Sequence, residues 1–117
     1  MGLLDVDRVR AALGPRLGDR FLQYATPPEA GEPGRLLIRI DEHVAGARGD
    51  VALAARVGMS CKRLLLRVDS ADAEQACAIV AAVRYFVDTY DLARDDEQYG
   101  YVDDAAVVDY VTESLKE

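Results

Sequence analysis

The part of the sequence most suggestive of chemistry is an acidic segment in its last third. Residues 90–104 read YDLARDDEQYGYVDD and hold six carboxylates with a single cation, Arg94. Carboxylate oxygens are the ligands that Mg²⁺ and Ca²⁺ take up in proteins, and side chains from two nearby turns can converge on one ion. The spacing is not that of an EF-hand, because Gly100 and a bidentate Glu fall at the wrong offsets. The candidate metal ligands are Asp91, Asp95, Asp103 and Asp104.

The same aspartates have two other interpretations. Asp accepts hydrogen bonds from backbone N–H groups at turns and helix starts, where the positive end of the helix dipole also stabilises a carboxylate. In this interpretation, which we favour, they join two helices, and Asp103 or Asp104 caps the last one. The other interpretation is a general acid and base pair, but the sequence singles out no such pair and no nucleophile. We therefore name no catalytic residue.

Tyrosines accompany the acidic segment and indicate a contact surface. Five of the six lie within or beside it: Tyr85, Tyr90, Tyr99, Tyr101 and Tyr110. Protein interfaces favour Tyr because it combines apolar area with a polar tip, although packing in the core with satisfied hydroxyl groups is the alternative. The candidate contact residues for a protein partner are Asp96, Glu97, Tyr99 and Tyr101.

The formal net charge of −7 is unevenly distributed along the chain. Residues 1–69 hold eleven Lys/Arg against nine Asp/Glu, whereas residues 70–117 hold three against twelve. We expect the acidic part to lie against the basic first half, to face a basic partner, or to mediate self-association. The negative charge argues against nucleic acid, because neutralising phosphates requires clustered Lys and Arg. It also makes membrane association the weakest hypothesis.

Other reactive side chains are few. Cys61 and Cys77 occur without a CxxC motif or a set of histidines, so the pattern predicts buried thiols and not zinc ligands. His43 is the only histidine, and no nucleophile or metal partner accompanies it in the pattern. The apolar run ACAIVAAV is too short to span a bilayer, and the first residues do not form a secretory signal. We expect a cytoplasmic protein with no cofactor other than the Mg²⁺ or Ca²⁺ of the metal hypothesis.

Apolar periodicity predicts the helices that position these residues. After Asp5 as a cap, a first helical pattern is interrupted at Gly14-Pro15 and continues to about residue 25. The sequence TPPEAGEPG then predicts a loop or a short flexible linker. Residues 35–47 carry both a strand-like and a helical pattern, of which we favour the helix.

Three further helices are predicted after residue 49. Asp50 caps the first, which should leave a solvated basic face of Arg56, Lys62, Arg63 and Arg67. Its expected buried positions are Val51, Ala54, Ala55, Gly58, Cys61, Leu65 and Val68. Asp69-Ser70 should cap an Ala-rich helix from Ala71 to Tyr90, which is apolar nearly all round and therefore central. The last helix follows the acidic segment.

The prediction is an all-α fold, a single compact bundle of about five helices. One domain spans residues 1–117, with a helical arm and the Pro/Gly-rich loop over residues 1–34 and a helical core over residues 35–117.

Three ordered blocks in AVRYFVDTYDLARDDEQYGYVDDAAVV carry a family resemblance over about residues 81–108. The blocks are Tyr85 and Phe86; then Asp91, Leu92 and Asp95; then Gly100, Tyr101, Asp103, Asp104 and Ala105. They resemble the YkvA-like domain, a small helical bacterial family of unknown function. Where that family usually has Ile-Pro, this chain has Ala93-Arg94, so the rigid turn that Pro would enforce is missing.

The resemblance implies a compact helical domain with Tyr85, Phe86 and Gly100 as structural residues of the motif, and it implies no reaction. Together with the charge pattern, it leads us to expect a non-enzymatic protein-interaction, accessory or regulatory module. The alternative is a divalent-cation-dependent enzyme or sensor that uses the four aspartates.

Overall fold

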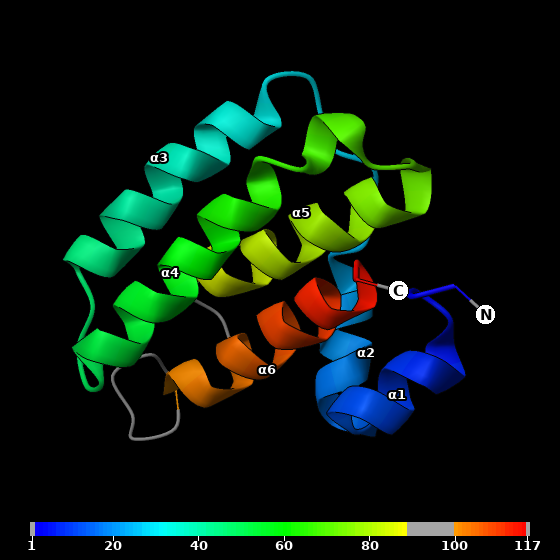
Figure 1. The fold of residues 1–117 in the computed structure, drawn as a ribbon. Coiled ribbons are helices and arrows are strands. Elements are labelled where there is room, and N and C mark those ends of the chain that lie inside the picture. Colours follow the sequence, from blue (N-terminus) through cyan, green and yellow to red (C-terminus); the bar gives the residue numbers. More distant parts are fainter. Residues whose placement is uncertain (1, 89–99, 117) are drawn as a thin grey trace.

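A computed structural model describes residues 2–88 and 100–116 of the chain. This part is all-helical (Figure 1), as predicted. Six α-helices and one 3₁₀ turn follow one another: α1 (Val6–Leu13), α2 (Pro15–Gln23), α3 (Glu32–Ala45), α4 (Val51–Leu65), the turn Val68–Ser70, α5 (Ala73–Val87) and α6 (Gly100–Ser114). None of the helices in these described ranges is long and apolar enough to cross a membrane.

The count of six helices differs from the predicted five because the first helical pattern is fully broken. Gly14 has a φ of 85°, a conformation that favours glycine, and Pro15 then begins α2. The predicted cap of α1 is confirmed, since the Asp5 carboxylate accepts a hydrogen bond from the Arg8 N–H at 3.1 Å. α1 and α2 pack against each other and then against α6 and α5, respectively.

α3 and α4 form an antiparallel pair (Figure 1), so the helical interpretation of residues 35–47 is correct. The pair is closely packed at Gly58, where a Cβ atom would lie 2.7 Å from the Val44 side chain. The Asp50 carboxylate caps α4 through the Leu53 N–H at 2.9 Å, as predicted. The side chains of α4 that face the core are Ala54, Val57, Cys61, Leu64 and Leu65.

The predicted buried stripe of α4 is only partly correct. Val51 and Ala55 are exposed, because the face that meets the core is centred on the side of Cys61 and includes Val57 and Leu64. The predicted basic face is confirmed for Arg56, Arg63 and Arg67, which are all exposed.

α5 is the central helix and contacts four other helices, α2, α3, α4 and α6. Every residue from Ala78 to Val87 is buried except Arg84. The predicted cap at Asp69-Ser70 is wrong, because residues 68–70 form the 3₁₀ turn. The helix begins instead with a capping box, in which Asp72 and Gln75 each bind the other's backbone N–H through their side chains.

Arg84 is the polar exception in α5, and it holds the loop between α2 and α3. Its guanidinium group binds both carboxylate oxygens of Glu32, at 2.8 and 2.5 Å. It also donates to the backbone carbonyl oxygens of Tyr24, Thr26 and Pro27 at 2.7, 3.1 and 3.2 Å. The Pro/Gly-rich segment is therefore an anchored loop whose second part, from Glu32 onward, already belongs to α3.

Candidate binding groove

The predicted site residues divide into two groups. Those outside the described residues are Asp91, Asp95, Asp96, Glu97 and Tyr99. Those that the structure describes are Tyr85, Phe86, Tyr101, Asp103 and Asp104, with Gly100 as the first residue of α6.

Asp103 and Asp104 both lie inside α6, so the prediction that one of them is the N-cap is wrong. Asp103 lies in the first turn, where the helix dipole still stabilises its carboxylate. Asp104 is fully buried. Within the described ranges, no three His, Cys, Asp or Glu side chains are grouped so that they could hold a metal ion. The four-aspartate metal site stays a prediction, because two of its ligands lie outside these ranges.

Cys61 is an unsuitable nucleophile. Burial, and secondly the nearby negative charge of Asp104, raises the pKa of the Cys61 thiol far above its ordinary value. A thiol that stays protonated is inert, because the thiolate is the reactive form. Both cysteines are free; Cys61 is buried as predicted, and Cys77 is half-buried.

Aromatic rings from α3, α5 and α6 meet in the core. The His43 ring lies 4.7 Å from that of Phe86, and the Tyr101 ring lies 6.3 Å from His43 and 6.5 Å from Phe86. Tyr101 is buried, so in this conformation it belongs to the core and not to the surface at which we expected it. Tyr85 is buried too, with its ring 5.8 Å from that of Tyr24. For these two tyrosines the packing alternative describes what the structure shows.

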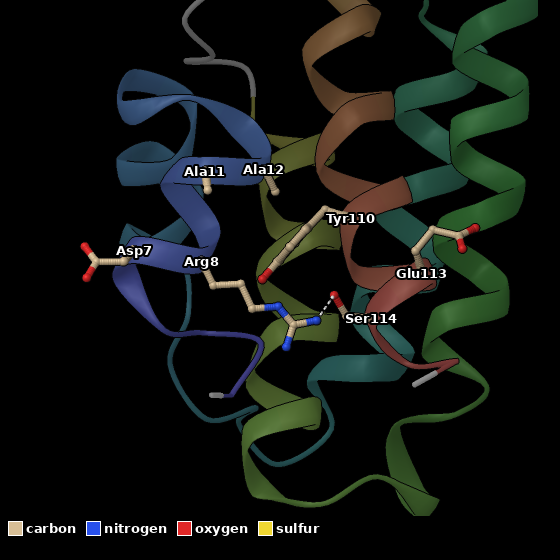
Figure 2. Close-up of a pocket in the computed structure, with 7 residues that line it drawn as sticks. All are labelled: Asp7, Arg8, Ala11, Ala12, Tyr110, Glu113 and Ser114. Atoms are coloured by element: carbon tan, nitrogen blue, oxygen red, sulfur yellow. Dashed lines mark hydrogen bonds between the residues drawn. The ribbon is translucent and has the colours of Figure 1, made fainter.

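A groove of about 550 Å³ lies between α1 and α6 (Figure 2). It is lined by Asp7, Arg8, Ala11 and Ala12 of α1 and by Tyr110, Glu113 and Ser114 of α6. The spacing of these residues places each set on one face of its helix. The two short alanines leave space beside the larger side chains of α6.

Tyr110 and Arg8 are fixed inside this groove. The Tyr110 hydroxyl donates to the Leu3 carbonyl oxygen at 2.5 Å, and its ring meets Phe21 edge to face at 6.2 Å. Arg8 reaches across from α1, donates to the Ser114 hydroxyl at 3.3 Å and places its guanidinium carbon 6.0 Å from the centre of the Tyr110 ring. These contacts hold the walls of the groove in place.

Acidic side chains border the groove on both sides. Asp7 and Glu113 are exposed and point outward in opposite directions (Figure 2). Glu113 pairs with Lys116 at 3.1 Å across exposed side chains, an interaction that contributes little energy. The groove therefore offers an apolar and aromatic strip beside the Arg8 guanidinium group, with a carboxylate on the outer side of each wall (Figure 2).

The sequence pointed to Tyr110 but not to the α1 side of the groove. The available signal was the adjacent pair Ala11 and Ala12, which falls off the apolar stripe of Val9 and Leu13. Nothing in the sequence shows that α1 and α6 are neighbours, since they lie about a hundred residues apart.

The chain matches no protein-family model, no curated protein and no solved structure.

Proposed function

We propose that this protein is a non-enzymatic interaction module, an accessory or regulatory subunit, that receives a basic segment of another protein. The contact surface is the acidic, tyrosine-bearing C-terminal part of the chain. It comprises Asp96 and Glu97 of the acidic segment and the exposed side of α6. The observation that supports the proposal is the α1–α6 groove, where Tyr110 and two alanines form an apolar strip beside Arg8, with Asp7 and Glu113 on the two walls.

The groove has the features of a peptide-docking site. Its volume falls in the range of about 300–1,000 Å³ that is common for ligand pockets. Apolar side chains of a partner would pack on Ala11, Ala12 and the ring of Tyr110, as in helix-in-groove recognition. Basic side chains of the partner would meet Asp7 and Glu113. The acidic charge of residues 70–117 would accelerate the encounter between the two proteins.

The described reactive groups favour binding over catalysis. The raised pKa of the Cys61 thiol keeps it protonated, and His43 packs against aromatic rings of the core. The resemblance to YkvA-like domains is part of the same proposal, and with it a bacterial and cytoplasmic setting.

The groove is tested by filling it. Ala11 is exposed on α1, so Ala11→Trp should occupy the groove and leave the core unchanged. Ala30→Trp is the matched control, because Ala30 is exposed in the loop outside the groove. Each variant is used to recover proteins from the source cell, and bound proteins are identified by mass spectrometry. We expect a protein that is retained by the wild type and the control and lost with Ala11→Trp.

The role of the acidic side chains is tested with the partner protein that this experiment identifies. A synthetic peptide that covers its basic segment should bind the wild type, and binding should weaken with added salt. The double variant Asp7→Asn/Glu113→Gln should bind the peptide more weakly, as should Asp96→Asn/Glu97→Gln in the acidic segment. Glu42→Gln/Asp69→Asn is the control, because it removes the same charge from exposed sites elsewhere. Equal binding by all four proteins contradicts the proposal.

A further inference from the structure

The outer face of the α3–α4 pair exposes aliphatic side chains that the core does not use. Ile38 on α3 is 61% exposed, and on α4 Met59 is 51% and Leu66 is 80% exposed. Single exposed aliphatic residues are ordinary on protein surfaces, whereas a contiguous group marks an interaction site.

An ion pair between the two helices fixes how they are aligned on this face. Lys62 of α4 binds Asp41 of α3 at 2.5 Å. Ile38 lies one turn before Asp41 on the same side of α3, and Leu66 lies one turn after Lys62 on the same side of α4. Because the helices are antiparallel (Figure 1), Ile38 and Leu66 are both displaced in the same direction from the Lys62–Asp41 ion pair. This geometry places Ile38 and Leu66 on the same side of the α3–α4 pair, with Met59 two turns before Leu66 along α4.

Three arginines border this aliphatic group on the side of α4 away from α3. Arg56, Arg63 and Arg67 are exposed, and none forms an ion pair with another described residue. Other cations of the first half do have partners, since Arg10 binds Asp19 and Arg35 binds Glu29. We call Ile38, Met59 and Leu66 together with the three arginines the basic–apolar face.

We propose that the basic–apolar face is a second docking surface, for an amphipathic helix of a protein partner that carries acidic residues beside its apolar stripe. Two antiparallel helices present a ridge and groove surface onto which a third helix packs. The unpaired guanidinium groups are complementary to carboxylates, which they bind in a bidentate manner. This surface goes beyond the function proposed above, because it uses other helices and the opposite charge.

The residue types favour a protein helix over the other anionic partners. Nucleic-acid surfaces interleave aromatic side chains that stack on bases, whereas this face carries only aliphatic ones. An anionic membrane would attract the arginines but repel a protein with a net charge of −7. A short acidic helix needs no aromatic platform, and it feels less of this repulsion because it contacts only the basic–apolar face and solvent ions screen the more distant charges.

The test uses a synthetic peptide of about five helical turns, with leucines along one face and glutamates on both flanks. Its binding is followed by fluorescence anisotropy at low and high salt. We expect saturable binding to the wild type, weakened about tenfold or more by Arg63→Glu/Arg67→Glu. Arg16→Glu/Arg48→Glu makes the same charge change at exposed sites off the face and should leave binding unchanged. Leu66→Ser should weaken binding, and its control Val51→Ser should not.

All substituted residues are exposed, so each variant should keep the helical circular dichroism of the wild type. The proposal is overturned if a scrambled peptide of equal composition binds equally well, or if the two charge-reversal variants behave alike. It is also overturned, in favour of a membrane, if the protein fails to bind the peptide but sediments with phosphatidylglycerol vesicles through Arg63 and Arg67.

Discussion

The loop held by Arg84 and the outer face of α4 use the same type of side chain in opposite ways. Arg84 and its partner Glu32 are only 14% and 13% exposed, and the guanidinium group also binds three backbone carbonyl oxygens. Arg63 and Arg67 are exposed and form no ion pair among the described residues. A largely buried cation must be matched by local acceptors, whereas an exposed one is free to serve a partner. The number of local acceptors thus separates an arginine of the scaffold from one suited to binding.

The largest effect should follow from removing the matched cation. Arg84→Ala leaves the carboxylate of Glu32 and three loop carbonyls without their donor, so we expect a loss of about 3–5 kcal/mol in the free energy of unfolding. Urea denaturation measures it. Arg10→Ala is the control, because it breaks an ion pair whose side chains are 46% and 48% exposed and should cost less than about 1 kcal/mol. Similar losses in the two variants would show that Arg84 stabilises the fold no more than an exposed arginine does.

The same ion pair should make stability depend on pH. Hydrogen bonding to Arg84 lowers the pKa of Glu32, although partial burial opposes the shift. The unfolded chain then takes up the proton at higher pH than the folded one. This stabilisation is present above the ordinary glutamate pKa of about 4.3 and is lost as the pH falls through the lowered folded value. Denaturation from about pH 6 to about pH 3 should show a shallower decline for Glu32→Gln than for the wild type. Parallel curves would contradict this assignment.

Substitutions at the N-terminal end of α5 should lower the free energy of unfolding less than Arg84→Ala does. Asp72→Ala removes the side chain that accepts the Gln75 N–H at 2.8 Å, and loss of such a cap costs about 1 kcal/mol. Asp69→Ala should be nearly neutral, because the 3₁₀ turn and not α5 contains this residue. Thermal denaturation of the two variants compares them directly, and a greater loss for Asp69→Ala would show that Asp69 and not Asp72 caps α5.

On the outer face of α4 the effect on stability should be small. Arg63→Glu/Arg67→Glu replaces exposed side chains that have no described ionic partner, so the free energy of unfolding should fall by about 1 kcal/mol or less, mainly because Arg63 lies at the negative end of the α4 dipole. A clear destabilisation, measured by the same urea denaturation, would mean that these arginines support the fold.

The smallest effect is expected from metal ions. If the aspartates of the acidic segment only join helices, melting after EDTA treatment should be unchanged by Mg²⁺, Ca²⁺ or Mn²⁺. A bound ion would instead raise the melting temperature with increasing concentration. In that case Asp103→Asn should abolish the shift, and the divalent-cation alternative would replace our interpretation.

Much of the fold was predictable because periodicity and caps are local signals. The caps at Asp5 and Asp50 and the buried side of α5 follow from residues within one or two turns of each other. The start of α5 was misplaced because Asp69, Ser70 and Asp72 are all good caps, and the 3₁₀ turn that decides between them depends on how α4 ends. The start of α6 was misplaced for a similar reason, since Asp103 and Asp104 both resemble caps.

The candidate site was less predictable, because it depends on which helices meet. The charge of the C-terminal part and the position of Tyr110 were visible in the sequence, but Asp7 and Ala11 become groove residues only through the contact of α1 with α6. Arg84 was likewise an inconspicuous cation in an apolar helix. Its role depends on loop carbonyls more than fifty residues away, a contact that no local pattern encodes.

The distance along the chain between Arg84 and its loop acceptors has a practical consequence. Arg84 restrains the carbonyl groups of residues 24, 26 and 27 only while α5 is docked beside α2 and α3, so local opening there should make the loop more accessible to limited proteolysis. Glu29 is exposed within this loop and offers a cleavage position for a glutamate-specific protease. The rate of cutting after Glu29 would therefore report how often the N-terminal helices detach from α5, well before the whole molecule unfolds.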